Sequence, residues 1–128
     1  MTHSFPVRVY YEDTDLAGIV YYANYLKFIE RGRSEWVREL GVDQLAMKAE
    51  GFVFAVRRVE ADYLAPARYD DELLVETRLE EIRPARLTVR QEVQRGGQVL
   101  FTALVTIVCL DAGGRPARLP SSLRGALT

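Results

Sequence analysis

A single long amphipathic helix is predicted for this chain, at residues 24–40, where apolar side chains repeat with a 3.6-residue period. Its apolar face carries Tyr25, Phe28, Ile29, Gly32, Trp36 and Leu40. Gly32 lacks a side chain in the middle of that face, so the helix can approach its neighbours closely there. Asn24 is expected to cap the helix N-terminus, and Gly41 is expected to end the helix. Because no other predicted helix is as long, this one must cover the apolar face of any sheet.

The rest of the sequence predicts mostly antiparallel strands, because apolar and polar residues alternate along it. The expected strands are residues 5–11, 52–63, 72–82, 86–95 and 99–110. The alternation slips at Arg57 and Arg58, which indicates a β-bulge, and Gly96 and Gly97 predict a hairpin turn. Residues 42–50 predict a short second helix.

The last predicted strand, residues 99–110, is apolar at nearly every position. Such a strand is expected to lie in the centre of a sheet, or to have its second face covered by another subunit. After it, Pro116 and Pro120 are expected to keep the tail irregular. The sequence thus predicts an α+β fold in which an antiparallel sheet wraps one long helix, and we expect residues 1–128 to form one domain.

The composition limits the chemistry that the chain can perform. Its 17 Lys and Arg against 18 Asp and Glu leave a net charge of −1, which argues against a nucleic-acid-binding protein. The single cysteine, Cys109, cannot form an intramolecular disulfide, and the single histidine, His3, stands near a terminus that is expected to be loose. Zinc sites of the His/Cys type and Ser-His-Asp catalysis are therefore almost excluded. Residues 1–15 lack the apolar segment of a signal peptide, and no apolar run is long enough to span a membrane, so a cytoplasmic protein is expected.

Three carboxylates, Glu12, Asp13 and Asp15, lie between the first predicted strand and the long helix. Loops between rigid elements often carry function, and Gly18 allows a tight turn in this one. The start of the helix near residues 22–24 offers unpaired backbone N–H groups and the positive end of the helix dipole. A carboxylate that acts as a nucleophile or as a general base, beside amides that polarise a carbonyl, suits attack on an acyl group.

Residues 11–33, YEDTDLAGIVYYANYLKFIERGR, contain the pattern D-x-D-x-x-G-x-V-[YW]-x-x-x-Y, followed by an apolar helix and E-R-x-R. This run resembles the signature of the 4-hydroxybenzoyl-CoA thioesterase-like hotdog family, most closely its YbgC-like acyl-CoA thioesterases associated with the bacterial Tol–Pal system. The similarity continues through DYLAPARYDDEL at residues 62–73 and PARLP at residues 116–120. The resemblance implies a hotdog fold, in which a five- or six-stranded antiparallel sheet curls around one long helix. It also implies hydrolysis of acyl-CoA, without a cofactor, at a dimer interface that commonly lies within a homotetramer.

In that family the catalytic carboxylate is the second acid of the D-x-D pattern, which corresponds to Asp15. The backbone N–H that polarises the carbonyl corresponds to Tyr22. Many YbgC-like proteins have histidine at this second position, and the tyrosine of this chain keeps the backbone donor but removes any role for an imidazole. Asp13 and Glu12 are expected to orient the loop. The nearby tyrosines either line an acyl pocket or serve ordinary packing: Tyr21, Tyr22 and Tyr25.

A CoA substrate carries phosphates, so basic residues are needed near the mouth of the pocket. Family position makes Arg83, Arg86 and Arg118 the candidates, and Arg58 beside the predicted bulge is a further one. Elsewhere on the long helix, Glu30 and Arg33 stand one turn apart, a spacing that allows a surface ion pair.

Three other functions remain open. A non-catalytic acyl-CoA-binding protein would keep the arginines but would be indifferent to substitution of Asp15. A thioesterase for acyl carrier protein would need a basic docking surface, for which Arg31, Arg33 and Arg38 on the long helix are candidates. A hotdog hydratase or dehydratase would need an Asp/His pair, and the only histidine of the chain is His3.

Overall fold

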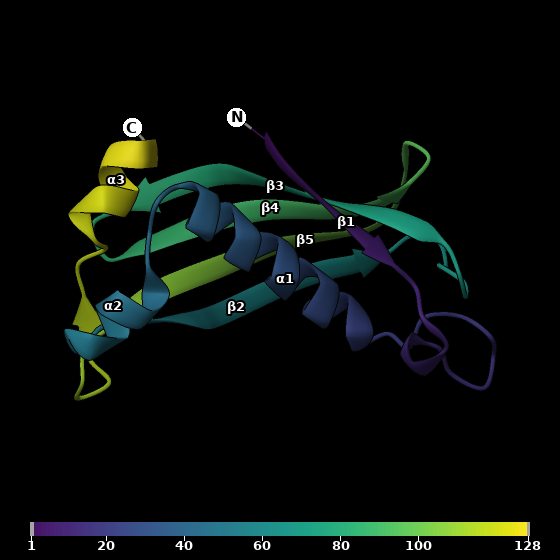
Figure 1. Cartoon of the computed structure of the whole chain (residues 1–128), viewed down its shortest axis with the longest axis horizontal. Helices are drawn as coiled ribbons and strands as arrows, with labels where there is room; N and C mark the ends of the chain where they lie inside the picture. Colours follow the sequence, from purple (N-terminus) through teal and green to yellow (C-terminus); the bar gives the residue numbers. More distant parts are fainter. Residues whose placement is uncertain (1, 128) are drawn as a thin grey trace.

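The computed structural model describes residues 2–127, and it has the predicted α+β arrangement of one antiparallel sheet around one long helix (Figure 1). The strands lie in the order β1-β3-β4-β5-β2, and β6 pairs with β5. Their bounds are β1 (Thr2–Arg8), β2 (Val53–Tyr63), β3 (Glu72–Arg83), β4 (Arg86–Arg95), β5 (Gln98–Leu110) and β6 (Pro116–Ala117). The helices are α1 (Asn24–Glu39), α2 (Gln44–Ala49) and α3 (Ser121–Leu127), with a 3-10 turn at Tyr11–Asp13. Of the helices in this described part, none is long and apolar enough to cross a membrane.

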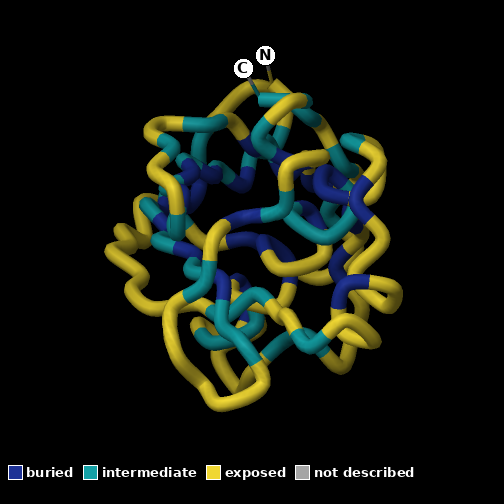
Figure 2. Tube along the Cα trace, turned by 90° about the vertical axis from the view of Figure 1, so that its left-hand side faces the viewer, coloured by how far each residue is buried: buried dark blue, intermediate teal, exposed yellow. Residues whose placement is uncertain are grey.

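The long helix α1 packs its apolar face on one side of the sheet, mainly against β1, β3 and β4. The buried residues of this face include the predicted Tyr25, Phe28, Ile29, Gly32 and Trp36. A Cβ atom at Gly32 would lie 2.5 Å from Cγ1 of Val75 in β3, so a glycine is required for this close approach. Figure 2 shows the buried segments gathered in the interior, with exposed loops around them.

Replacing Gly32 by Ala should lower the free energy of unfolding by about 1–3 kcal/mol, because the added methyl group must displace α1 or the Val75 side chain. Urea unfolding followed by circular dichroism measures this loss. Gly125→Ala is the matched control, since a Cβ atom at this glycine of α3 meets nothing within 4 Å. Equal stability of Gly32→Ala and the parent protein would show that the contact with Val75 does not limit the packing of α1.

Strand β5 lies between β4 and β2, so the strongly apolar strand is central, as expected. The expected bulge in β2 is confirmed by a shift of register between Val56 and Arg58. Within residues 2–127, β2 pairs only with β5, so the outer edge of its 11 residues is unpaired. Exposed apolar side chains follow this strand: Val53 (39%), Val56 (47%), Val59 (39%) and Tyr63 (49%). A long edge strand of this kind is a surface for pairing with another chain.

The prediction of a strand at residues 5–11 is wrong at both ends, because β1 spans Thr2–Arg8. After β1 the backbone leaves its ladder with β3, and the amide of Val9 donates to the carbonyl of Asp71 instead. The chain then winds into the 3-10 turn at Tyr11–Asp13. The alternation of apolar and polar residues continues past the end of β1, but the backbone hydrogen bonds there no longer go to β3. The alternation alone therefore places the end of the strand too late.

Two expectations about side chains near the ends of α1 are also wrong. His3 does not lie in a loose terminus, because it belongs to β1 and its Nε2 atom lies 3.0 Å from the carboxylate of Glu39. Asn24 is not the N-cap, a position that Ala23 occupies; its side-chain amide donates instead to the carbonyl of Asp13 at 2.9 Å. At the other end, Gly41 follows the helix with a φ of +87°, as a helix stop requires.

The tail is ordered, contrary to the expectation of irregular structure. β6 pairs with the end of β5, and α3 begins directly after Pro120. The side chains of Leu119 and Leu123 are buried in the core. A proline is compatible with the start of a helix, because the first helical amides have no acceptor within the helix.

Candidate active site

The acidic segment before α1 folds into a tight loop over residues 14–20. The amide of Asp15 donates to the carbonyl of Ile19 at 2.9 Å, and the amide of Gly18 donates to the carbonyl of Asp15 at 2.9 Å. Gly18 has a φ of +78°, a conformation that favours glycine. A β-bridge closes the loop at its base. The segment is therefore a small hydrogen-bonded hairpin with Asp15 near its turn.

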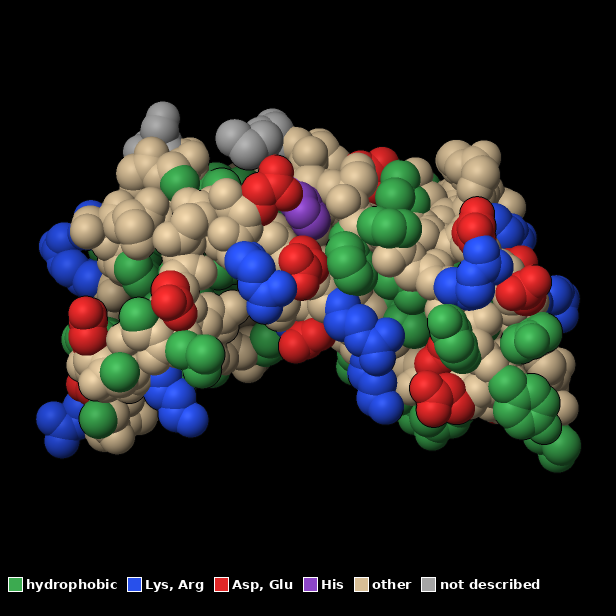
Figure 3. All heavy atoms as spheres, in the orientation of Figure 1, with side chains coloured by type: hydrophobic (Ala, Val, Ile, Leu, Met, Phe, Trp, Pro, Cys, Tyr) green, Lys and Arg blue, Asp and Glu red, His purple; other side chains and the backbone are tan. Residues whose placement is uncertain are grey.

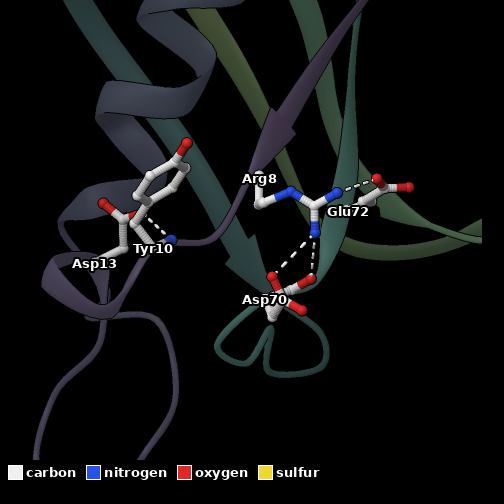
Figure 4. Close-up of polar contacts among 5 residues, drawn as sticks. All are labelled: Arg8, Tyr10, Asp13, Asp70 and Glu72. Atoms are coloured by element: carbon white, nitrogen blue, oxygen red, sulfur yellow. Dashed lines mark hydrogen bonds and ion pairs between the residues drawn. The ribbon is translucent and has the colours of Figure 1, made fainter.

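Asp13 holds this hairpin against the protein, as predicted. Its carboxylate accepts the amide of Tyr10 at 2.7 Å (Figure 4), and its carbonyl accepts the amide of Tyr21 at 2.9 Å. The same carbonyl accepts the side chain of Asn24. Asp13 is engaged by the loop itself, which leaves Asp15 as the accessible carboxylate of the D-x-D pattern.

Arg8 fixes the end of β1 beside the turn that leads into β3 (Figure 4). Its Nη1 donates to the carbonyl of Asp70 at 3.1 Å and to the carboxylate of Asp70 at 3.0 Å, and its Nη2 pairs with the carboxylate of Glu72. Because these side chains are exposed, the ion pairs contribute little to stability. Their effect is to hold two chain segments together next to the acidic loop.

The side chain of Asp15 is exposed, and its Oδ1 atom accepts the amide of Ala17 at 2.9 Å. Within residues 2–127 no other donor is bonded to this carboxylate. Its charge contributes to a raised pKa of the Tyr21 phenol, an effect due chiefly to the neighbouring hydroxyl of Tyr22. The carboxylate is thus oriented, accessible and close to the start of α1. In the same part of the chain, no group of three or more His, Cys, Asp or Glu side chains is placed to hold a metal ion.

The start of α1 presents free backbone donors. The amides of Tyr22 and Ala23 have no hydrogen-bond acceptor within the described chain. The hydroxyl of Tyr63 donates to the carbonyl of Tyr22 at 2.9 Å, which ties this point to the C-terminal end of β2. The amide of Tyr21 donates to the carbonyl of Asp13 across the hairpin. The free amide of Tyr22, the next residue, therefore lies at the base of the loop that carries Asp15. Free amides at a helix N-terminus can stabilise a developing oxyanion.

Tyr25 belongs to the core and does not line an open pocket. Its ring stacks on Phe101 at a centroid distance of 5.0 Å, and its hydroxyl oxygen accepts the amide of Ala67 at 3.1 Å. Burial raises the pKa of its phenol. Ordinary packing therefore accounts for Tyr25, whereas Tyr21 and Tyr22 remain exposed.

Three of the four candidate arginines gather at the end of the sheet opposite the acidic loop (Figure 1). Arg83 and Arg86 flank the turn between β3 and β4. A backbone hydrogen bond of 2.8 Å from the tail to the carbonyl of Pro84 brings Arg118 beside that turn. Arg58 lies apart from them, exposed on β2. Within one chain, the candidate catalytic residues and the candidate phosphate-binding residues are therefore not neighbours.

A groove of about 240 Å³ opens between α1 and the side of the sheet formed by β5 and β2. Its apolar lining includes Trp36, Val37, Phe54, Val56, Ile107 and Leu123. Arg33 and Glu30 both line it, but no ion pair within 4.0 Å joins them, so the prediction of a surface ion pair is wrong. The Nη1 atom of Arg33 donates to Oε1 of Gln91 at 3.0 Å. Among residues 2–127, no carboxylate lies within 4.0 Å of this guanidinium.

Gln91 is a site residue that sequence reasoning missed. Its Nε2 atom donates to the carbonyl of Ile29 at 2.8 Å and to the hydroxyl of Thr77 at 2.9 Å. Both Gln91 and Thr77 are fully buried. The available signal was the position of Gln91 between Val89 and Val93, on the inward face of β4. A glutamine in such a row requires a buried partner.

Comparison with known proteins identifies the family. A sequence profile of the thioesterase-like superfamily matches residues 9–127. The chain belongs to this superfamily. The acyl-CoA thioesterase YbgC of Haemophilus influenzae is 40% identical over 125 residues, which cover 96% of this chain and 92% of that protein. The acyl-CoA thioester hydrolase YbgC of Escherichia coli O6:H1 is 42% identical over 120 residues, which cover 92% of this chain and 90% of that protein.

The fold of this thioesterase is shared with solved structures of the same family. A probable thioesterase from Bartonella henselae superposes with a TM-score of 0.90 at 39% identity, over 94% of this chain and 100% of that one. The helix wrapped by an antiparallel sheet is thus the hotdog fold that the sequence resemblance implied. The chain is an enzyme that hydrolyses thioesters.

Proposed function

We propose that this thioesterase hydrolyses acyl-CoA to a free acid and CoA, with Asp15 as the catalytic carboxylate and the amide of Tyr22 as the carbonyl polariser. The observation that carries the proposal is an exposed, oriented carboxylate beside free amides at the start of α1. The names of the two YbgC relatives support CoA as the carrier of the acyl group. A cytoplasmic location accords with the single cysteine, Cys109, which is a buried free thiol.

In this mechanism the amide of Tyr22 donates to the carbonyl oxygen of the thioester and stabilises the negative charge that develops there. Asp15 attacks the carbonyl carbon to give a mixed anhydride that water then hydrolyses, or it removes a proton from an attacking water. In both routes the C–S bond breaks, and the CoA sulfur leaves with the bonding electrons and takes up a proton. The new oxygen of the acid comes from water, and no histidine is needed.

The proposed active site is completed in a homodimer, alone or within a tetramer, that forms by antiparallel pairing of two β2 strands. The unpaired edge of β2 and its exposed apolar side chains support this arrangement. Figure 3 shows the molecule hollowed along this edge, between α2 and the loop before α1. A two-fold axis would place the C-terminal end of one β2 beside the N-terminal end of the other.

This pairing would bring the arginine cluster of one subunit (Arg83, Arg86 and Arg118) close to the loop of residues 14–20, here called the catalytic loop, of the other subunit. The loop is tied to the C-terminal end of β2 through Tyr63, whereas the arginine cluster lies at the N-terminal end of β2. Each loop would therefore face the arginine cluster of the partner subunit. We assign the phosphates of CoA to this cluster and to the exposed arginine of β2: Arg58, Arg83, Arg86 and Arg118.

Thiol release from a panel of acyl-CoAs with short, long and aromatic acyl groups tests the proposed activity. The expected result is release of CoA that depends on Asp15. Binding of acyl-CoA without release would instead favour a non-catalytic binding protein. Release only from thioesters of acyl carrier protein would favour the carrier-protein alternative, for which Arg31 and Arg38 are exposed on α1.

A further inference from the structure

Arg33 is a half-buried cation in a largely apolar groove, and within residues 2–127 no carboxylate lies within ion-pair distance of its guanidinium. Burial lowers the pKa of its guanidinium, and the charge of Glu30 only partly offsets this effect. Glu30 is exposed on α1 and lines the same groove, but it lies beyond ion-pair distance of Arg33. Removing a charge from water is costly unless the charge is paired and hydrogen-bonded. A partner for Arg33 is therefore expected from outside the described part of this chain.

The guanidinium of Arg33 is also held in a fixed position. Gln91 accepts one of its N–H groups, and Gln91 is itself bonded to the carbonyl of Ile29 and the hydroxyl of Thr77. The close approach of α1 at Gly32 brings that carbonyl within reach of Gln91. A guanidinium carries five N–H donors, and Gln91 is its only bonded acceptor among residues 2–127, so most of the donors remain for a ligand.

We infer that Arg33 binds a carboxylate at the far end of the acyl group, so that the preferred substrates are CoA thioesters of dicarboxylic acids. The inference rests on the proposed acyl-CoA hydrolysis and names its substrate class. A carboxylate can accept two parallel N–H groups from one guanidinium, a geometry that few other groups match. The apolar lining at Trp36, Phe54 and Ile107 suits the methylene chain between the thioester and the carboxylate.

The groove is placed to receive an acyl group from the catalytic loop of the partner subunit. Phe54 and Val56 line the groove at the N-terminal end of β2, whereas Tyr63 marks the end that carries the loop of the same chain. Antiparallel pairing of two β2 strands would bring the partner's loop to the N-terminal end. The thioester would then lie at the loop of one subunit, with the acyl chain extending into the groove of the other toward Arg33.

Kinetics with acyl-CoAs of equal carbon number test this inference. Glutaryl-CoA and valeryl-CoA differ in the terminal carboxylate, and the parent enzyme should prefer glutaryl-CoA by about 10- to 100-fold in kcat/KM. Arg33→Met removes the charge and should abolish the preference, chiefly by lowering kcat/KM for glutaryl-CoA. Arg33→Lys keeps the charge and should retain part of the preference. Arg31→Met is the matched control on an exposed arginine of the same helix, and it should leave the ratio unchanged.

Three outcomes would overturn the inference. Equal kcat/KM values for the two substrates in the parent enzyme would show that Arg33 does not select a carboxylate. An equal loss of kcat/KM for both substrates in Arg33→Met would show that Arg33 only holds Gln91 in place and does not bind the substrate carboxylate. Dissociation of Arg33→Met into monomers, measured by light scattering, would show that Arg33 meets an anion of the partner subunit.

The failure of this inference is distinguishable from the failure of the proposed function. Hydrolysis of valeryl-CoA without a preference for glutaryl-CoA would overturn the substrate class and leave the acyl-CoA thioesterase in place. Absence of thiol release from every acyl-CoA of the panel would overturn both.

Discussion

Asp15→Asn should lower kcat for acyl-CoA hydrolysis by about 10³-fold or more while the fold and the binding of CoA persist. The asparagine keeps an oxygen that can accept the amide of Ala17, so the loop should retain its shape. The substitution removes the negative charge that attacks the thioester or activates water in the proposed mechanism. Because Asp15 is exposed, the loss of its charge should change the free energy of unfolding little. Thiol release at saturating substrate measures kcat, and thermal melting checks the fold.

Glu12→Gln is the matched control for this prediction. It removes one negative charge from the same segment, and Glu12 is exposed without a bonded partner in the described chain. Its kcat should equal that of the parent. If Asp15→Asn turns over within about tenfold of the parent, Asp15 is not the catalytic carboxylate. A loss of the same size in Glu12→Gln would mean that the net charge of the loop, and not the position of Asp15, sets the rate.

The spacing of apolar residues predicts α1 and most of the strands, because burial of one face of a helix or strand makes apolar residues recur at a fixed interval along that segment. It fails where a distant part of the chain decides the structure. Val9 continues the alternation of β1, yet its hydrogen bonds go to residues 70 and 71 and not to the ladder with β3. Pro120 is typical of an irregular segment, yet α3 follows it because the side chain of Leu123 is buried in the core and stabilises the helix.

In the candidate site too, local interactions could be predicted from the sequence and interactions between distant residues could not. Asp13 and Asp15 could be given different roles from the motif, because the hydrogen bonds that distinguish them close within one short loop. The role of Arg33 could not be predicted, because its acceptor Gln91 is 58 residues away in sequence. The separation of the arginine cluster from the loop that carries Asp15 follows from strand order, which spacing along the chain does not encode.

Val59→Glu should separate the proposed β2–β2 dimer into single subunits and lower kcat/KM for acyl-CoA by about 100-fold or more. Val59 is exposed near the middle of β2, so in an isolated subunit the change should alter the free energy of unfolding by less than about 0.5 kcal/mol. Across a two-fold axis at β2, the two glutamates would lie near each other without partners, and like charges in an interface oppose association. Light scattering gives the mass, and thiol release gives kcat/KM.

Leu45→Glu is the matched control for Val59→Glu, because Leu45 is also an exposed apolar side chain but lies on α2. Its mass and activity should equal those of the parent. An unchanged mass of Val59→Glu would place the interface away from β2, and a fully active monomer would show that each chain contains a complete site. The second outcome would conflict with the position of the arginine cluster at the β3–β4 turn, at the far end of the sheet from the loop before α1. A single chain would then have to bind the phosphates of CoA without that cluster.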